Sequence, residues 1–525
     1  MSFPAGSIGA LHRGPKMSQL LPILILLAVV GIVLARLPSV EGVNHSDAYK
    51  KRRVMNWLPL GLTYAFLYMG RYNLKVSKFA FEEMPDPSGG ALMANADFGI
   101  IFTVGVWVYG CSFLINGPLT DRYGGRFSIL MGAGGSALAN LLMGLAAWSL
   151  LNDGPGRASI AENFVLIFSV LYGLNMYFQS FGAVAIVKCN APWFHVRERG
   201  VFGAIFGILI SLGIYFAFDW GYFIVDNYEV QWVFLVPTIL LVVFWVVDFV
   251  IVRNTPGDAG LVDFDTADAS SGDDGPQLPA LEVFKRMLSN PIIVTIACIE
   301  FCSGFLRQAI MQWYRTFAKQ TDVMLGLKDS FVYENWGMLL CCAGIMGGVI
   351  AGVISDHMFQ SRRGPVAGIL YGAMLLGSIV LVFAYDTPAV GLLVIVMSMC
   401  VIGVHGMLSG TASMDFGGKR NVGIAVGIID GFVYLGTGVM SLAYAWLLPQ
   451  EQFDEAGKLI GPATEPTNWI AWPLAMIPLA LLGALLSLKV WNAKPKPKGS
   501  STQPPEPSAE PTAASEASSP DATVE

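Results

Sequence analysis

The sequence predicts an all-α membrane protein built from two related six-helix halves. Of its 525 residues, 54% are hydrophobic and only 13% are charged, whereas about a quarter of the residues in soluble domains are charged. Apolar runs of about 20 residues, the length that crosses a hydrocarbon core, recur along nearly the whole chain. A polar stretch near the middle divides twelve of these runs six and six, and similar motifs occur in both halves.

The individual spans follow from the positions of the apolar runs. An additional run at 19–36 precedes the two halves, and Arg36 and Pro38 stand where a signal peptide carries small residues at its cleavage site. We therefore interpret this run as an uncleaved anchor helix, with a cleaved signal peptide as the alternative. The other spans are expected at 55–81, 97–118, 127–150, 162–190, 201–225, 230–253, 291–318, 331–356, 364–386, 388–412, 421–448 and 468–491.

Composition divides the chain into five parts. The stretch at 256–280 is rich in Asp, Gly and Ser, and the tail begins KPKPKGSSTQPPEPSAEP, so neither can bury a core. The expected parts are an N-terminal membrane helix with a basic linker (1–54), an N-terminal six-helix bundle (55–253), a cytoplasmic linker (254–290), a C-terminal six-helix bundle (291–493) and a disordered tail (494–525).

Basic residues fix the expected orientation. Lys and Arg gather in alternate connections, for example at 50–53, 285–286 and 419–420, and such connections lie on the cytoplasmic side. The intervening loops carry acidic residues such as Glu82, Glu83 and Glu451 instead. Twelve helices therefore start and end inside the cell, and the extra span places the N-terminus outside. The expected location is the cell inner membrane.

Two arginines in the interior of apolar spans occupy matching positions in the two halves. Arg71 precedes Asp121, in the segment GPLTDRYGGR, by 50 residues (121 − 71). Arg307 precedes Asp356, in the segment GVISDHMFQSRRG, by 49 residues (356 − 307). Internal symmetry of this kind is typical of secondary transporters with a binding site at the membrane midplane.

The first arginine belongs to a polar stripe. Tyr64, Tyr68, Arg71, Lys75 and Lys78 follow one another at steps of four, three, four and three, which places them on one helical face. A charge in lipid costs about 2.5 to 3.5 kcal/mol on insertion scales. Because packing rarely justifies that cost, the stripe predicts the wall of a polar cavity that attracts anions.

The second arginine shares a face with an acid. Glu300 precedes Arg307 by seven residues, and Gln308, Gln312 and Trp313 lie beside or beyond the arginine. Glu300 is either a functional carboxylate or a partner that neutralises Arg307 or a neighbour. An arginine fork binds two phosphate oxygens at once, so two facing arginines predict a phosphate clamp.

Three further ionisable residues lie in apolar spans. They are Asp219, His405 and Asp430, and each is a functional candidate by default. Asp219 is either a coupling residue or a solvated residue near a helix end. His405 has either a substrate contact or a structural hydrogen bond. Glu300, Asp219 and Asp430 together are the candidates for coupling or charge balance.

Charged loop residues predict a gate. An Asp at a helix end with nearby arginines can hold adjacent helices together and release them during a transport cycle. The predicted gating residues are Asp121, Arg122, Arg126, Asp356, Arg362 and Arg363.

Motifs of enzymes and metal proteins are missing from the sequence. No phosphate-binding P-loop and no Ser/His/Asp constellation occurs, and the seven cysteines lie in apolar runs without the spacing of a zinc site. We therefore expect no enzyme activity, no catalytic residues, no cofactor and no metal.

Several segments match known transporters. GPLTDRYGGR resembles the signature loop of the major facilitator superfamily. YAFLYMGRYN around Arg71, FLRQAIMQW around Arg307, and the later segments WFHVRERG, NTPGDAGL, SDHMFQSRRG and MDFGGKRNVG resemble the organophosphate:phosphate antiporter family, which includes bacterial glycerol-3-phosphate and hexose-phosphate transporters. The resemblance covers about residues 55 to 490. It implies the major facilitator fold and alternating access.

The resemblance also implies roles for individual residues. Arg71 and Arg307 correspond to the family's phosphate-binding pair, Tyr64, Tyr68 and Tyr109 to tyrosines of the cavity, and Trp313 to an aromatic residue just past the second arginine. Phe113 and Ile210 stand where the glycerol-3-phosphate transporter has a lysine and a histidine. That departure argues against glycerol 3-phosphate, and Lys78 and the IIDG around Asp430 are more similar to animal sugar-phosphate exchangers.

The predicted function is exchange of a small organic phosphate, of the sugar phosphate, glycerol phosphate or phosphoglycerate type, for inorganic phosphate. One alternative is proton-coupled symport of an organic anion, and another is a transporter-like sugar-phosphate sensor. Expected partners are the phosphorylated metabolite, inorganic phosphate and the lipid bilayer. We expect a monomer that binds no nucleic acid.

Overall fold

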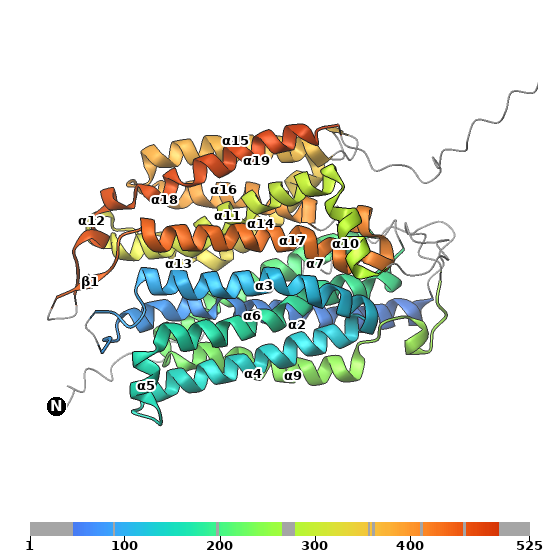
Figure 1. Ribbon diagram of the computed structural model, residues 1–525, viewed down its shortest axis with the longest axis horizontal. Coiled ribbons are helices and arrows are strands. Elements are labelled where there is room, and N and C mark those ends of the chain that lie inside the picture. The colour runs from blue at the N-terminus through green and yellow to red at the C-terminus, as the bar shows by residue number, and fades with distance from the viewer. Residues whose placement is uncertain are drawn as a thin grey trace, which may run out of the picture. The chain divides into compact units, whose positions relative to one another are not determined.

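The structure is a computed structural model, and it describes residues 46–87, 90–195, 199–264, 279–354, 358–359, 363–409, 413–454 and 458–492. These residues are almost entirely helical (Figure 1). The predicted helix at 19–36 and the tail at 494–525 lie outside the described part of the chain. The first half comprises α2 (Asp47–Glu82), α3 (Asn95–Tyr123), α4 (Gly125–Leu151), α5 (Arg157–Glu162), α6 (Phe164–Asn190), the 3-10 turn η1 (Ala191–Trp193), α7 (Arg199–Tyr215), the π-helical turn η3 (Phe216–Trp220), α8 (Gly221–Asn227), α9 (Gln231–Ile251) and the 3-10 turn η4 (Gly257–Ala259).

The second half repeats this pattern of long helices and short connections, and one connection contains the antiparallel strands β1 (Gln452–Phe453) and β2 (Leu459–Ile460). The sequence did not predict this hairpin, because two-residue strands leave no periodic pattern. The helices are α10 (Ala280–Leu288), α11 (Pro291–Gln320), α12 (Asp322–Leu325), α13 (Phe331–Glu334), α14 (Trp336–Val353), α15 (Arg363–Ala384), α16 (Val390–Met407), α17 (Ser413–Leu447), the 3-10 turns η7 (Pro462–Thr464) and η8 (Pro466–Trp469), α18 (Ala471–Leu474) and α19 (Met476–Lys489).

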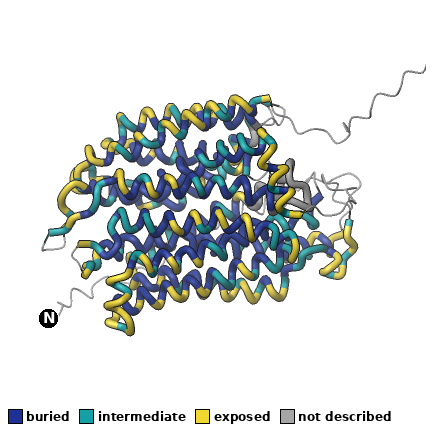
Figure 2. The backbone as a smooth tube through the Cα atoms, viewed as in Figure 1, coloured by how far each residue is buried: buried dark blue, intermediate teal, exposed yellow. Residues whose placement is uncertain are grey.

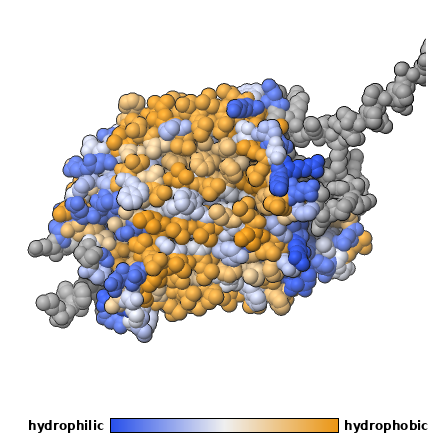
Figure 3. Space-filling model, viewed as in Figure 1, coloured by the Kyte–Doolittle hydropathy of each residue, from blue (hydrophilic) through white to orange (hydrophobic). Residues whose placement is uncertain are grey.

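The helices have the length and composition of membrane spans. Ten helical segments within the described residues are long and apolar enough to cross a membrane, and Trp336–Ala351 is a shorter apolar helix. The 36-residue α2 is long enough but less apolar, because its inner face carries tyrosines, asparagines and three cations. Together these helices correspond to the twelve predicted spans. Figure 3 shows apolar side chains along the middle of the helices and hydrophilic ones at their ends, as a lipid-embedded protein requires.

Burial locates the centre of the helical bundle. Dark blue, buried stretches run along α2, α3, α6 and α17, whereas exposed residues gather at helix ends and on outer helices (Figure 2). Helix α17 packs against both α3 and α11, and α7 packs against α14. Helices of the two predicted halves therefore meet along two seams. The predicted division into separate bundles at 55–253 and 291–493 stays a prediction, because the described residues of both belong to one compact unit.

Two glycines let α11 and α17 approach closely. A Cβ atom on Gly304 would lie 1.9 Å from the Val433 carbonyl oxygen, and one on Gly436 would lie 2.0 Å from the Phe301 carbonyl oxygen. Small residues at such contacts bring helix backbones together in membranes. The contact fixes the height of α11, and hence of Arg307, against α17.

Candidate functional site

Arg71 lies near the middle of α2 and is only 2% exposed. Its Nε donates to Gln179 Oε1 at 3.0 Å, its Nη1 to the Tyr434 hydroxyl at 2.8 Å and its Nη2 to the Tyr109 hydroxyl at 2.9 Å. The guanidinium carbon also lies 4.6 Å from the ring centroids of both Tyr68 and Tyr109. All these partners are uncharged, and within the described chain no carboxylate oxygen lies within 4.0 Å of the guanidinium. The positive charge is held in place but not neutralised.

A chain of amides behind Arg71 fixes the orientation of Gln179. Gln179 Nε2 donates to Asn175 Oδ1 at 3.2 Å, and Asn140 Nδ2 donates to the same oxygen at 3.0 Å. Because the Gln179 amine is used in this way, its oxygen faces Arg71. The Tyr172 hydroxyl and Asn175 Nδ2 also donate to the carbonyl oxygens of Arg71 and Gly70, at 2.8 and 2.7 Å. Helix α6 therefore positions the arginine through both its backbone and its side chain.

Arg307 on α11 is buried to 8% exposure but is not held in the same way. Its Nε is buried without a hydrogen-bond partner, and the guanidinium forms no ion pair with any described residue. The hydroxyls of Tyr72 and Tyr434 and the carboxylate of Glu300 lie within electrostatic range of it. Since Tyr434 also bonds Arg71, this one tyrosine of α17 lies between the two arginines. A largely buried guanidinium with unused donors favours an anionic ligand.

Helix α11 presents further polar groups next to Arg307. Gln308 Nε2 donates to the Tyr72 hydroxyl at 3.1 Å, and Gln312 Nε2 donates to Gln308 Oε1 at 2.9 Å. Gln312 Oε1 and the Trp313 Nε1 are buried without partners. Buried polar atoms are nearly always hydrogen-bonded, so these two atoms are candidate ligand contacts.

Two acids of the second half have partners of their own. Glu300 Oε2 lies 2.8 Å from His405 Nδ1 across α11 and α16, and its Oε1 is buried without a partner. Asp430 accepts a hydrogen bond from Ser409, and His405 and Arg307 lie within electrostatic range of it. Of the two sequence alternatives for Glu300, the geometry favours a pair with a neighbour, and that neighbour is His405 rather than Arg307.

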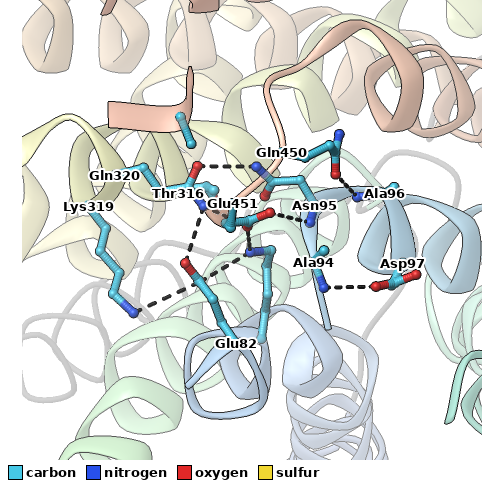
Figure 4. A network of polar contacts seen from close by, with 12 residues as sticks. Glu82, Ala94, Asn95, Ala96, Asp97, Thr316, Lys319, Gln320, Gln450 and Glu451 are labelled. Atoms are coloured by element: carbon cyan, nitrogen blue, oxygen red, sulfur yellow. Dashed lines mark hydrogen bonds and ion pairs between the residues drawn. The ribbon is translucent and has the colours of Figure 1, made fainter. Parts of the chain in front are cut away.

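Lys78 belongs to an ion-pair network. Figure 4 labels other members of this network, among them Glu82, Gln320 and Glu451. The Lys78 Nζ lies 2.6 Å from Glu451 Oε1 and 3.2 Å from Glu82 Oε2. Gln320 Nε2 donates to Glu451 Oε1 at 2.6 Å, and the Asn95 backbone N–H donates to Glu451 Oε2 at 2.7 Å. The network joins α2 and α3 to α11 and the connection after α17. The predicted substrate contact of Lys78 stays a prediction, since its charge is already balanced here.

Lys75 lies one helical turn beyond Arg71 and is 1% exposed. Its ammonium donates to the Thr316 hydroxyl and lies 4.8 Å from the Phe98 ring centroid and 5.4 Å from that of Trp313. Within the described part of the chain, it forms no ion pair. Lys78, by contrast, pairs with two carboxylates.

Asp219 lies in the π-helical turn η3 and caps a helix of the other half. Its Oδ1 and Oδ2 accept from the backbone N–H groups of Gly337 and Met338, at 2.7 and 2.9 Å, at the start of α14. The first N–H groups of a helix lack intrahelical partners, and a carboxylate satisfies them with charge complementarity. The sequence allowed either a coupling residue or a solvated residue near a helix end. The structure is closer to the second alternative, although Asp219 lies at the start of α14 and not at the end of its own helix.

The predicted gating residues are only partly described. Asp121 Oδ1 lies 2.7 Å from Lys188 Nζ of α6, and Arg126 donates to the Asn254 side chain and the Phe249 carbonyl. Arg122 lies over the ring of its neighbour Tyr123, at 5.3 Å. Asp356, Arg362 and the side chain of Arg363 lie outside the described residues.

Several residues of the site were not predicted from the sequence. Gln179 and Tyr434 bond Arg71 from 108 and 363 residues away, and no local pattern marks either of them. Arg315 was not among the predicted residues, although it is buried between the rings of Tyr222 and Tyr333, at 3.5 and 4.0 Å from the ring centroids. Asp248 accepts a hydrogen bond from the Thr63 hydroxyl at 2.6 Å. It is an acid within an apolar run, and this position in the sequence could have identified it.

The structure gives no sign of a metal centre in the segments it describes. No group of three or more His, Cys, Asp or Glu residues is placed to hold a metal there, and the seven cysteines are free.

The chain matches a family of membrane transporters. Residues 60–441 match the model of the Major Facilitator Superfamily. The glycerol-3-phosphate transporter of Bacillus subtilis (strain 168) is 26% identical over 483 residues, which cover 87% of this chain and 96% of that protein. A probable hexose phosphate transport protein of Chlamydia pneumoniae is 23% identical, covering 85% and 93%. The membrane sensor protein UhpC of Escherichia coli (strain K12) is 22% identical, also covering 85% and 93%.

Solved structures with the same fold are more distant in sequence. The D-xylose-proton symporter is 14% identical, with a TM-score of 0.56 over 84% of this chain and 97% of that chain. The nucleoside transporter NupG is 12% identical, with a TM-score of 0.55 over 84% and 100%. At this identity the likeness shows the shared fold, which is the predicted one.

Proposed function

The chain belongs to the Major Facilitator Superfamily, a family of transporters rather than enzymes, and on this premise we propose that it exchanges a small organic phosphate for inorganic phosphate. Exchange proceeds by alternating access between the predicted bundles at 55–253 and 291–493. The protein acts as a monomer in the cell inner membrane, with the basic connections on the cytoplasmic side.

The observation that carries this proposal is the pair of buried arginines, neither of which forms an ion pair within 4.0 Å with a described residue. Arg71 is held by Gln179, Tyr109 and Tyr434, and Arg307 has an unpartnered Nε. A buried charge without a counter-charge costs several kcal/mol, and an anion placed between the two guanidinium groups removes that cost. Planar guanidinium forks match phosphate oxygens in pairs. The names of the relatives, which include glycerol-3-phosphate and hexose phosphate transporters, support the same substrate class.

The second part of the proposal concerns the state of the molecule. The Lys78–Glu451 network and the Asp219 cap on α14 both join the two halves at the end that carries the acidic loops. With the basic loops inside, this is the outer end. The structure then corresponds to a state closed toward the outside, and both contacts break when the protein opens outward.

Counterflow in proteoliposomes tests the exchange. Vesicles loaded with unlabelled inorganic phosphate should take up labelled phosphate from outside, and an unlabelled organic phosphate added outside should compete with that uptake. Arg71→Lys keeps the charge but loses the fork, so we expect exchange to fall by about a hundredfold. Arg157→Lys is the matched control, because Arg157 pairs with Asp153 at the surface. Exchange that Arg71→Lys leaves intact contradicts the proposal.

A second candidate function is proton-coupled symport of an organic anion. The Glu300–His405 pair favours it, because two titratable groups share a hydrogen bond of 2.8 Å inside the second half and membrane-interior acids often carry protons in transporters. A pH gradient alone, without internal phosphate, then drives uptake. Uptake that depends on internal phosphate and ignores the gradient rejects it.

A third candidate, a sensor of sugar phosphates, is favoured only by the likeness to the membrane sensor proteins UhpC. A pure sensor binds its ligand without net flux. Fast exchange by the purified protein, measured in the same vesicles, excludes that function.

A further inference from the structure

One face of α11 carries three polar side chains in a row. Glu300, Ser303 and Arg307 follow one another at steps of three and four, which places them on the same helical face. Glu300 and Ser303 are fully buried. Each of the three presents a buried atom without a hydrogen-bond partner among the described residues, namely Glu300 Oε1, Ser303 Oγ and Arg307 Nε. Buried polar atoms are nearly always hydrogen-bonded, so this row indicates a ligand that extends from Arg307 toward the start of α11.

Two residues of other helices complete the cluster around Glu300. His405 Nδ1 of α16 lies 2.8 Å from Glu300 Oε2. Asp430 of α17 lies within electrostatic range of Glu300, His405 and Arg307. The His405 side chain is 21% exposed and Asp430 is half-buried. The protein therefore does not seal the cluster completely, and a small molecule can reach it.

The charges of this cluster disfavour a second anion. A phosphate group carries a charge of about −1.5 to −2 at neutral pH, and in the proposed exchange it offsets the charges of Arg71 and Arg307. Glu300 and Asp430 then stand beside a single imidazole, that of His405. Because a protonated imidazole balances only one carboxylate, the cluster stays negative in either state of His405. A further carboxylate placed here would be repelled.

Hydroxyl groups match the unused atoms of the row. A hydroxyl both donates and accepts, whereas an ionised carboxylate only accepts. A ligand hydroxyl can therefore donate to Glu300 Oε1 and bond the Ser303 hydroxyl in either direction. Ser303 and Glu300 precede Arg307 by about 6 and 10 Å of helix rise. A phosphorylated chain of three to six carbons covers this span.

We propose that Glu300, Ser303 and Asp430 form a hydroxyl subsite for the organic part of the substrate, and that this subsite excludes a carboxylate. The inference rests on the proposed exchange function and narrows its substrate class to sugar phosphates and glycerol phosphate, without phosphoglycerate. Inorganic phosphate has no organic part and does not use the subsite. The subsite therefore affects only one of the two exchanged substrates.

Three ligands of equal chain length test the subsite. Glycerol 3-phosphate carries two hydroxyls, 3-phosphoglycerate has a carboxylate in place of the terminal hydroxymethyl group, and propyl phosphate has neither hydroxyl. In wild-type vesicles that exchange phosphate for phosphate, we expect glycerol 3-phosphate to inhibit at concentrations about tenfold lower than either of the others. Equal or stronger inhibition by 3-phosphoglycerate overturns the inference, and so does equal inhibition by propyl phosphate.

A six-carbon set covers a protein that accepts only larger substrates. Glucose 6-phosphate and 6-phosphogluconate share the chain and the phosphate position, and they differ in a hydroxyl against a carboxylate at the first carbon. Hexyl phosphate is the reference without hydroxyls. The same order is expected, with glucose 6-phosphate about tenfold better than each of the other two. A preference for the carboxylated compound in the set that binds overturns the inference.

Two variants connect the rejection of a carboxylate with the acids. Glu300→Gln and Asp430→Asn each remove one negative charge and keep a side chain that can form hydrogen bonds. Each should improve 3-phosphoglycerate relative to glycerol 3-phosphate about tenfold. Thermal stabilisation of the purified variants by each ligand gives the same ratio without transport. If both variants keep the wild-type ratio, the acids do not exclude the carboxylate and the inference fails.

A matched pair of serines tests the recognition of hydroxyls. Ser303→Ala should lower the preference for glycerol 3-phosphate over propyl phosphate about fivefold, the effect of one hydrogen bond. Ser378→Ala is the control, because Ser378 is equally buried but already donates to the Met374 carbonyl of its own helix. It should leave the preference unchanged. Equal effects of the two substitutions would exclude a specific contact at Ser303.

The two proposals fail in different ways. If no phosphate exchange occurs, or if none of the six organic phosphates inhibits it in wild-type vesicles, the exchange function itself is wrong. If organic phosphates compete without regard to hydroxyl or carboxylate groups, the exchange function stands and the hydroxyl subsite is rejected. If the variants do not fold, the wild-type ratios still decide.

Discussion

The two charged layers on α2 differ in the partners of their cations. Toward the middle of the helix, Arg71 is surrounded by hydroxyls, an amide and aromatic rings, and Arg307 across from it has an unpartnered nitrogen. Two turns farther along, Lys78 lies between two carboxylates in a network that joins both halves. The same helix thus holds one cation ready for a ligand and another that is already satisfied.

This difference separates recognition from closure. A cation whose partners are neutral gains most when an anion arrives, so it suits a binding site. A cation paired across the two halves stabilises one arrangement of those halves, so it suits a gate. Both layers place a buried cation on α2, and their tertiary partners differ. The following substitutions test that distinction, beginning with the largest expected effect.

Lys78→Met should destabilise the closed arrangement most. It leaves Glu82 and Glu451 without their shared cation, and removal of one partner from a buried pair costs about 3–5 kcal/mol. Thermal unfolding in detergent measures the loss. Lys319→Met is the matched control, because Lys319 reaches only the rim of the network and lies 3.4 Å from the exposed Glu83. A double-mutant cycle with Glu451→Gln should show strong coupling. Additive effects would show that the network does not act as a unit.

Single substitutions of Arg71 and of Arg307 should change the stability in opposite directions, although each of them should abolish exchange. Arg307→Met removes a buried charge that forms no ion pair within 4.0 Å with a described residue, so we expect a gain of about 1 kcal/mol in stability. Arg71→Met leaves Gln179 Oε1 buried without a donor, so we expect a loss of about 1–3 kcal/mol. Thermal unfolding without ligand measures both. Equal losses would mean that Arg307 has a structural partner after all.

Asp219→Asn should weaken the contact between η3 and α14. An amide offers one acceptor where the carboxylate offers two, and it carries no charge for the helix terminus, so the expected loss is about 1 kcal/mol. Asp226→Asn on the exposed side of α8 is the control. The hydrogen exchange rates of the Gly337 and Met338 amides report on this contact directly. Unchanged rates at these two amides would contradict the predicted role of Asp219.

Arg157→Ala should have the smallest effect. Arg157 pairs with Asp153 four residues away, and both side chains are more than half exposed, so the pair contributes about 0–1 kcal/mol and is weakened by salt. Unfolding at low and high ionic strength measures it. A loss comparable to that of Lys78→Met would mean that burial does not govern these ion pairs.

The helices and the fold were predictable because both depend on local signals. Apolar runs mark the spans, and the spacing of Arg71 and Arg307 from the following Asp loops marks the repeat. The roles within the site were less predictable, because they depend on distant partners. Lys75 and Lys78 look equivalent on the helical face, but Glu451, 373 residues away from Lys78 in the sequence, pairs with Lys78 and not with Lys75.

A single acidic loop residue shows the same limit. Glu451 was interpreted only as a marker of loop orientation, since a loop glutamate is normally solvated. Its side chain is instead buried among Lys78, Gln320 and the Asn95 backbone. Sequence reasoning assigns a charge to a side of the membrane, whereas the fold decides whether water or another side chain surrounds it.

The glycine contact between α11 and α17 determines which part of the site can adapt to a substrate. Because Gly304 and Gly436 leave no space for even a methyl group, Arg307 on one helix and Tyr434 on the other form a rigid template of fixed spacing. Arg71 and Lys75 belong to another helix and face this template from across the molecule. The site can therefore adapt to larger or smaller substrates only by movement of α2. Substitutions selected for a new substrate should occur along α2 and in the residues that pack against it, and not at the α11–α17 contact.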